Sequence, residues 1–271
     1  DIGVAMGTGV DVAKQAADMI LADDNFATIE KAIEEGRGVY ENIRKSVIFL
    51  LSSNLGELMT MFVAVAMGLA SPLKSSHILW INLITDSLPA LALGVDKNDS
   101  KSLMRCPPRK ASESLFARGG IACTLFYGAL ITVIGLAAFL VLPCGILAAE
   151  GELVGNPFTW VERLRELMSR EQILAKSQTY AFTVLGMCQL YHAIGMRDVQ
   201  KSVFAMSPRD NLLMVAACII GFILQFAVTE IPFLIRAFGT SHLSGQEWLL
   251  LSVLAAFPLF AHEVIVLFTK N

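Results

Sequence analysis

Six apolar runs dominate this sequence, and each is about as long as a helix that crosses a lipid bilayer. A hydrocarbon core about 30 Å thick takes about 20 apolar residues as a helix. Inside lipid the backbone must satisfy its own hydrogen bonds, which leaves helices and closed barrels as the spanning structures. We therefore predict a mainly α fold built around a six-span transmembrane helical bundle. The runs cover residues 47–69, 77–95, 120–142, 178–196, 212–229 and 248–269.

The composition agrees with a chain that lies in the lipid bilayer. Hydrophobic side chains make up 55% of the 271 residues and charged side chains 17%, whereas about 25% of residues are charged in soluble domains. A mean hydropathy of +0.60 also excludes a disordered chain. The net charge of −3 gives no global basic surface, so we expect no nucleic acid partner.

The Lys and Arg residues of the connections predict the orientation. Connections 96–119 and 197–211 carry six and three basic residues, whereas 70–76 and 230–247 carry one each. Basic connections stay on the cytoplasmic side, so we expect both termini there. The 143–177 connection, predicted to be an extracytoplasmic loop that contains Cys144, has four basic and five acidic residues and opposes this orientation weakly.

Residues 1–38 differ in kind from the rest of the chain. Apolar run 2–6, helical stretch 10–17 and apolar run 19–22 precede Asp-Asp-Asn at 23–25, a typical helix start. This strand, helix, strand, helix order is typical of the edge of an α/β layer, and the segment is too short to hold a core of its own.

An apolar stripe connects this segment to the first membrane run as one helical pattern. Gly36 and Gly38 are predicted to interrupt or kink the helix. Unbroken over 39–69, it would be about 46 Å long at 1.5 Å per residue. Such a helix can couple a cytoplasmic domain mechanically to the middle of the membrane.

Two acidic residues stand inside the first two apolar runs, near their centres. Asn54 and Glu57 are three residues apart, and Asn82, Thr85 and Asp86 follow the i, i+3, i+4 spacing of one helix face. An ionised carboxylate at this depth costs at least about 2.5–3.5 kcal/mol. Carboxylate, amide and hydroxyl oxygens suit calcium, which takes 6–8 oxygen ligands, so we predict a cation site formed by these side chains.

Other intramembrane polar residues have simpler explanations. The site has no His or Cys beside it, which argues against zinc or copper. Pro89 and Gly56 are predicted to loosen their helices and free carbonyl ligands. Serines in spans serve as interhelical hydrogen bonds about as often as they serve a site. That alternative stays open for Ser52, Ser53 and Ser87. Glu230 and Glu263 are expected at the membrane interfaces. His77, His192 and His262 are expected to be packing residues.

Several phrases of the sequence follow one another as in calcium-transporting P-type ATPases. They are Asp-Ile-Gly-Val-Ala-Met-Gly-Thr-Gly at 1–9, Leu-Ala-Asp-Asp-Asn-Phe at 21–26, Glu-Glu-Gly-Arg at 34–37, Ser-Ser-Asn-Leu-Gly-Glu at 52–57, Trp-Ile-Asn-Leu-Ile-Thr-Asp at 80–86 and Cys-Pro-Pro-Arg at 106–109. The chain resembles the C-terminal third of such a pump over essentially its full length. On general similarity, the lineage is bacterial.

The resemblance implies a domain organisation and a ligand set. Residues 1–38 would close a Rossmann-like phosphorylation domain, and residues 39–271 would form the membrane transport domain, the last six of ten spans. Asn54, Glu57, Asn82, Thr85 and Asp86 would be calcium ligands. Sodium and potassium pumps usually have an acid in place of Asn82, and secretory-pathway calcium and manganese pumps usually have Met in place of Thr85, so the sequence is similar to the sarcoplasmic-type branch.

The same resemblance places the catalytic centre outside these residues. Such a pump transfers the γ-phosphoryl group of ATP to an Asp with the help of magnesium. The Asp-Lys-Thr-Gly-Thr phosphorylation motif does not occur in this sequence, so we expect the fragment alone to hydrolyse no ATP. Its expected partners are the lipid bilayer and the N-terminal remainder of the pump, with its actuator, nucleotide and phosphorylation domains and first four spans. A bacterial plasma membrane is the expected location.

Two alternatives remain open. One is a P-type pump for manganese or a monovalent cation. The other is a passive cation channel or membrane scaffold, although a channel needs repeated weak sites and a continuous pore.

The family acid of the fourth span would align with Gly186, with only Gln189 nearby. Two divalent ions would then leave uncompensated positive charge in a low dielectric. We therefore predict one calcium per cycle, with Glu57 exchanging protons or supporting the site.

Overall fold

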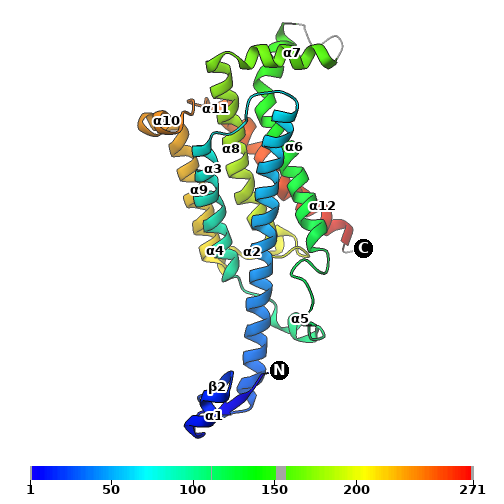
Figure 1. Cartoon of the computed structure of the whole chain (residues 1–271), viewed down its shortest axis with the longest axis vertical. Coiled ribbons are helices and arrows are strands. Elements are labelled where there is room, and N and C mark those ends of the chain that lie inside the picture. Colours follow the sequence, from blue (N-terminus) through cyan, green and yellow to red (C-terminus); the bar gives the residue numbers. More distant parts are fainter. Residues whose placement is uncertain (1, 111, 151–156, 270–271) are drawn as a thin grey trace.

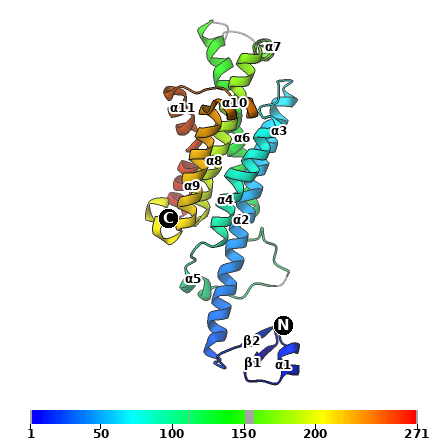
Figure 2. The ribbon, with the colours of Figure 1, turned by 90° about the vertical axis from the view of Figure 1, so that its left-hand side faces the viewer.

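The structure is a computed structural model that describes residues 2–110, 112–150 and 157–269. It is mainly α, as predicted. Long helices lie side by side in an elongated bundle, and a small α/β unit lies beyond one end of it (Figures 1 and 2). The helix α7 (Pro157–Met168) lies at the opposite end. The two ends of the bundle are therefore built differently.

The N-terminal unit confirms the predicted order of elements. Strand β1 (Val4–Met6), helix α1 (Asp11–Ala16) and strand β2 (Met19–Leu21) precede helix α2. The strands pair in parallel, with Val4 opposite Met19. The next helix starts where predicted: Asp23 accepts a hydrogen bond from the Thr28 hydroxyl at 2.5 Å. This bond holds the pKa of Asp23 below its usual value, so the carboxylate is ionised at neutral pH.

Helix α2 (Ala27–Ala66) is continuous for 40 residues. The prediction that Gly36 and Gly38 interrupt it is wrong, because the helical backbone passes through both glycines. Neither glycine would place a Cβ within 3.4 Å of a neighbour, so close packing does not explain them. At 1.5 Å per residue the helix is about 60 Å long, and it links the α/β unit to the far end of the bundle (Figure 2).

The second apolar run is divided into three pieces. Helix α3 (Ser75–Trp80) leads into a π-helix, η1 (Ile81–Asp86), and then into α4 (Ser87–Gly94). The wider π turns contain Asn82, Thr85 and Asp86, and such turns often mark functional sites. The predicted loosening of this helix is confirmed, and it lies just before Pro89.

The next two runs form longer helices than predicted. Helix α6 (Gly120–Ala149) continues through Pro143, and α8 is Glu171–Met196. The prediction that residues 143–177 form a loop is therefore wrong, since most of the described residues in this range are helical. Cys144 lies in α6, half-buried against the core, instead of in a loop.

The remaining elements complete the bundle. Its last long helices are α9 (Leu212–Glu230), α11 (Gly245–Ala255) and α12 (Phe257–Thr269), and α10 (Pro232–Phe238) connects α9 to α11. Short elements join α4 to α6 and α8 to α9. They are α5 (Ser100–Arg105) and the 3-10 turns η2 (Val203–Ala205) and η3 (Pro208–Asp210).

Four helices in the described part of the chain are long and apolar enough to cross a membrane. They are Ala27–Ala66, Gly120–Ala149, Leu212–Glu230 and Gly245–Phe268. The other two predicted runs form the divided α3–η1–α4 segment and the more polar α8. Helix α8 lies at the centre, and nearly every residue from Ser177 to Met196 is buried. The core therefore forms around α8.

Helices α2 and α6 pack with their backbones close together. A Cβ on Gly56 would lie 2.5 Å from Ile131 Cγ2, and a Cβ on Gly128 would lie 2.7 Å from Leu55 Cδ2. The Thr132 hydroxyl donates to the Gly128 carbonyl at 2.7 Å and lies 3.4 Å from that of Gly56. The expectation that Gly56 loosens α2 is thus wrong, because the glycine allows close helix packing instead.

Candidate cation site

The candidate site lies where α2, η1 and α8 meet, and one amide joins them. Gln189 on α8 donates a hydrogen bond from Nε2 to Glu57 Oε1 on α2. The Thr85 hydroxyl on η1 donates to Gln189 Oε1 at 2.9 Å. All three side chains are buried. The structure therefore brings Glu57 and Thr85, predicted from different spans, into one hydrogen-bonded cluster.

Asp86 follows Thr85 and is the most exceptional group in the cluster. It is 1% exposed, and neither carboxylate oxygen has a hydrogen-bond partner among the described residues. It directly follows Thr85, which shares the Gln189 amide with Glu57. A buried carboxylate beside a second acid is costly unless a cation or a proton compensates it. The carboxylates of Glu57 and Asp86 therefore need a cation or protons to compensate their charge.

The backbone around Asp86 is held by side chains of η1 and of the first residue of α4. Asn82 Nδ2 donates to the Ile78 carbonyl at 3.0 Å, and Ser87 Oγ donates to the Asn82 carbonyl at 2.7 Å. These bonds occupy carbonyls that a regular α-helix would pair with backbone amides. The distorted turn therefore stays ordered while it carries Thr85 and Asp86 into the bundle.

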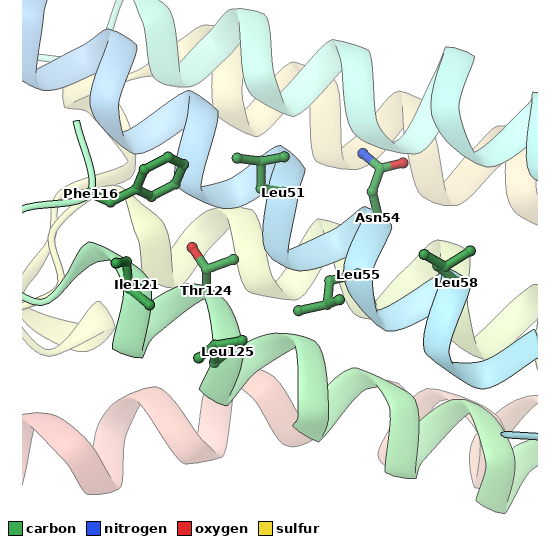
Figure 3. A pocket seen from close by; sticks show the side chains of 8 residues that line it. All are labelled: Leu51, Asn54, Leu55, Leu58, Phe116, Ile121, Thr124 and Leu125. Atoms are coloured by element: carbon green, nitrogen blue, oxygen red, sulfur yellow. The ribbon is translucent and has the colours of Figure 1, made fainter. Parts of the chain in front are cut away.

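Asn54 lies apart from this cluster. Its side chain is exposed, and Nδ2 donates to the Leu50 carbonyl one turn earlier at 2.8 Å. It lines an apolar groove of about 420 Å³ between α2 and α6 (Figure 3). The groove is lined by Leu51, Asn54, Leu55, Leu58, Phe116, Ile121, Thr124 and Leu125. Asn54 and the half-buried Asn82 each bond a carbonyl of their own segment, so their roles as ligands stay predictions.

Sequence reasoning missed two buried polar side chains on the helices α8 and α9. Gln225 on α9 is fully buried, and neither of its amide atoms has a hydrogen-bond partner in the described structure. The Thr183 hydroxyl on α8 is also buried and unpartnered there. Polar residues inside apolar runs 178–196 and 212–229 were the available signal, the same one that pointed to Asn54 and Asn82.

Several other polar side chains have protein partners, although Ser53 Oγ and Ser177 Oγ are buried without one among the described residues. His77 Nε2 lies 3.0 Å from the Phe238 carbonyl, and its ring stacks on Phe182. Glu230 accepts a hydrogen bond from Trp248 Nε1 at 3.1 Å. His192 and His262 bond Ser52 Oγ at 2.8 Å and the Lys201 carbonyl at 3.0 Å, and Glu263 accepts from the Val203 amide at 2.6 Å. The histidines have the packing roles predicted for them.

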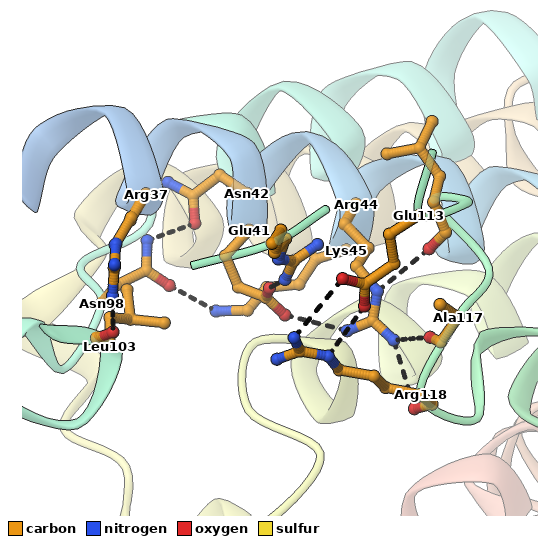
Figure 4. A network of polar contacts seen from close by, with 12 residues as sticks. Arg37, Glu41, Asn42, Arg44, Lys45, Asn98, Leu103, Glu113, Ala117 and Arg118 are labelled. Carbon is orange, nitrogen blue, oxygen red and sulfur yellow. Dashed lines mark hydrogen bonds and ion pairs between the residues drawn. The ribbon is translucent and has the colours of Figure 1, made fainter. Parts of the chain in front are cut away.

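A second polar network binds the α4–α6 connection to the end of α2 nearest the α/β unit (Figure 4). Four side chains of α2 are its donors to this connection. The contacts are Arg37 to the Leu103 carbonyl at 2.7 Å, Asn42 to the Asp96 carbonyl at 2.8 Å, Arg44 to the Ala117 carbonyl at 2.7 Å and Lys45 to Asn98 Oδ1 at 2.9 Å. Helix α2 is therefore attached at several points to the connection that leaves the candidate site.

Comparisons with known proteins show the family of the chain. Residues 70–268 match the family described as "Cation transporting ATPase, C-terminus". The chain is 44% identical over its full length to Calcium-transporting ATPase 1 of Bacillus cereus, covering 29% of that protein. It is 39% identical to the Calcium-transporting ATPase of Bacillus subtilis, covering 96% of the chain and 26% of the relative. The endoplasmic reticulum calcium ATPase srcA of Aspergillus fumigatus is 38% identical over 92% of the chain, which covers 26% of that protein.

Proposed function

The chain belongs to the cation-transporting ATPase family, and from this premise we propose that it is the membrane part of an ATP-driven calcium pump. It spans less than a third of the length of the curated relatives it matches. In this proposal the six-span bundle carries the intramembrane calcium ligands, and α2 couples them to the phosphorylation domain.

One observation carries the proposal: the buried carboxylate of Asp86 has no hydrogen-bond partner among the described residues and directly follows Thr85, which is joined to Glu57 through Gln189. A calcium ion is a natural partner for it, because calcium accepts irregular sets of oxygen ligands at 2.3–2.6 Å. The donor set here consists of carboxylate, hydroxyl and amide oxygens. Among the described residues, His, Cys, Asp and Glu form no group of three or more that could hold a metal, so further ligands from this part of the chain would be neutral oxygens.

We propose that Asn54 and Asn82 complete the site in the whole pump. The preceding spans of the parent protein would cover the apolar groove that Asn54 lines and bring further oxygens to the site. The exposed position of Asn54 beside Leu51 and Leu58 supports this assignment, since an exposed polar side chain among apolar ones is otherwise costly in lipid.

The remainder of the pump would supply the chemistry. In this proposal residues 1–38 close the phosphorylation domain, where ATP and magnesium bind and an Asp is phosphorylated. Helix α2 continues without a break from the α/β unit to Glu57. The Arg37 and Arg44 contacts bind it to the α4–α6 connection, so a movement at the phosphorylation domain would reach the site through both elements.

We propose that one calcium ion moves per cycle. A second divalent ion would need a further acid. The side chains near Glu57 and Gly186 are instead the neutral amides of Gln189 and Gln225. Glu57 already has a protein donor in Gln189, which fits a supporting or proton-exchanging group. Equilibrium calcium binding per phosphorylatable site would be near one, and a value near two would contradict this.

The location follows from the same reasoning. We propose a bacterial plasma membrane with both termini in the cytoplasm, supported by the basic connections and by the two Bacillus relatives. The exposed Cys106 should react with impermeant thiol reagents only from the cytoplasmic side. Labelling of Cys106 from outside would reverse the orientation.

Transport by the full-length protein tests the function. Reconstituted into vesicles, it should accumulate calcium only with ATP and magnesium, and Asp86→Asn should abolish this uptake. Uptake without ATP would show a passive channel, and a preference for manganese or a monovalent ion would show a different pump. The 271-residue fragment alone should form no phosphoenzyme.

A further inference from the structure

Gln225 of α9 is one of the buried polar side chains of the bundle that have no partner among the described residues. Its side chain is 0% exposed, and both Oε1 and Nε2 are without a hydrogen-bond partner in the described residues. Buried amides in proteins are almost always paired, because an unmade hydrogen bond in a low dielectric is unfavourable. This amide therefore points to a ligand that the protein chain does not itself provide.

Gly186 of α8 explains where the amide lies. A Cβ at this glycine would be 2.9 Å from Gln225 Oε1 and 3.7 Å from Thr85 Cγ2. The amide of Gln225 thus occupies the space into which a side chain at position 186 would project. That space borders Thr85, whose hydroxyl is bonded to Gln189.

We propose that Gln225 Oε1 is a ligand of the transported divalent cation, supplied from α9 in place of the side chain that Gly186 lacks. This rests on the proposed function. The cation would lie between this oxygen and the unpartnered carboxylate of Asp86, with Thr85 beside it. An amide oxygen is a hard ligand suited to calcium.

The ligand adds an oxygen without adding a charge. Glu57 and Asp86 remain the acids of the described cluster, so the site keeps the charge of a single divalent ion. Helix α9 also becomes part of the ion site, although its sequence carries no acid before Glu230 at its end.

Gln225→Met separates a ligand from a space-filling side chain, because Met has nearly the same length and volume but offers only a weak thioether acceptor. In the full-length protein in detergent, without ATP, equilibrium binding of radioactive calcium should weaken at least tenfold. The matched control is Gln178→Met on α8, whose side chain bonds the Ser71 carbonyl at 2.8 Å. Its calcium affinity should match the wild type. Calcium affinity of Gln225→Met within twofold of the wild type would overturn the proposal.

Thermal unfolding in calcium-free buffer shows whether the variant is folded. Gln225→Met removes an unsatisfied buried amide, so its melting temperature without calcium should equal or exceed that of the wild type. The rise in melting temperature on adding calcium should shrink, since ligand stabilisation follows affinity. A lower melting temperature without calcium, together with an unchanged rise, would show a structural role only.

Gly186→Ala gives an independent variant that leaves the amide in the chain. The new Cβ would lie 2.9 Å from Gln225 Oε1, so the amide has to move away and calcium should bind more weakly. Combined with Gln225→Met, the substitution should cost little more than Gln225→Met alone, because both remove the same contact. Fully additive losses would contradict the proposal.

Asp86→Asn separates failure of the proposed function from failure of the role proposed for Gln225. If the wild type binds calcium and Asp86→Asn does not, the proposed function holds, and the Gln225 variants then decide this inference alone. If the wild type binds no calcium, the proposed function fails.

Discussion

Helix α2 has two faces that meet the rest of the bundle in opposite ways at the same depth. Toward α6, Gly56 brings the backbones together, and the Thr60 and Thr132 hydroxyls both have carbonyl partners. Toward η1 and α8, Glu57 and Thr85 both bond the side-chain amide of Gln189. The Asp86 carboxylate on this side lacks a partner among the described residues. Two consecutive residues, Gly56 and Glu57, belong to these two faces.

The contrast distinguishes polar groups that hold the fold from polar groups that await a ligand. The Thr60 and Thr132 hydroxyls bond backbone carbonyls alone, which serves packing, whereas the Thr85 hydroxyl also bonds the side chain of Gln189. A buried carboxylate or amide without a partner is retained at a cost to stability. We therefore infer that the contact between α2 and α6 around Gly56 and Gly128, called the anchor below, stabilises the fold. The side of α2 that faces η1 and α8 carries the candidate site.

The largest expected effect is loss of the site by Asp86→Asn in the full-length protein. Removing the unpartnered carboxylate takes away a charged ligand, so calcium-dependent phosphorylation by ATP should fall below detection. The control is Glu230→Gln, because Glu230 already contacts Trp248 and His242. It should keep most of its phosphorylation, and equal losses in the two variants would mean that the site lies elsewhere.

A larger side chain at the α2–α6 anchor should lower the free energy of unfolding and leave the calcium affinity unchanged. In Gly128→Ala the new Cβ would lie 2.7 Å from Leu55 Cδ2 and 3.2 Å from Leu55 Cβ, which should destabilise the fold by about 1–3 kcal/mol. Thermal unfolding in detergent measures this. Gly145→Ala on the same helix is the control, since no atom lies within 4 Å of its Cβ. A changed calcium affinity at unchanged stability would show that the two faces are not separate.

A matched pair of threonines gives the smallest effect. Thr132 has a bonded hydroxyl, whereas that of Thr183 is buried and unpartnered in the described structure. Thr132→Val removes the contact with the Gly56 carbonyl of α2 and should lose about 0.6 kcal/mol of stability, the mean for hydrogen bonds between membrane helices, and Thr183→Val should lose none. Thermal unfolding without calcium compares them. If Thr183→Val weakens calcium binding, the site extends further along α8 than proposed.

The acidic residues of the candidate site could be singled out from the sequence, because the cost of a carboxylate in lipid is independent of the fold. Glu57 and Asp86 stand out in any apolar run, and the spacing of Thr85 and Asp86 follows from helix geometry alone. The strand and helix order of the first residues was also predictable, since its apolar runs and helix start signal are local.

Some of the errors concern features that a single helical segment does not reveal. Gly56 loosens nothing, because its neighbour is another glycine-containing helix, and a single span cannot reveal that. Pro143 is tolerated inside α6, so the predicted loop does not begin there. Gln225 lies far along the chain from the acids, and only the arrangement of α9 against Gly186 brings it to notice.

The adjacency of Gly56 and Glu57 restricts how α2 can move. Successive residues of a helix point about 100° apart, so turning Glu57 away from Gln189 also turns Gly56 away from Gly128. A larger residue of α2 would then face Ile131, where even a Cβ at position 56 would come within 2.5 Å. Rotation about its own axis is thus not an independent degree of freedom for α2. A piston or tilting motion in which α6 travels as one body with α2 would open the site without this collision.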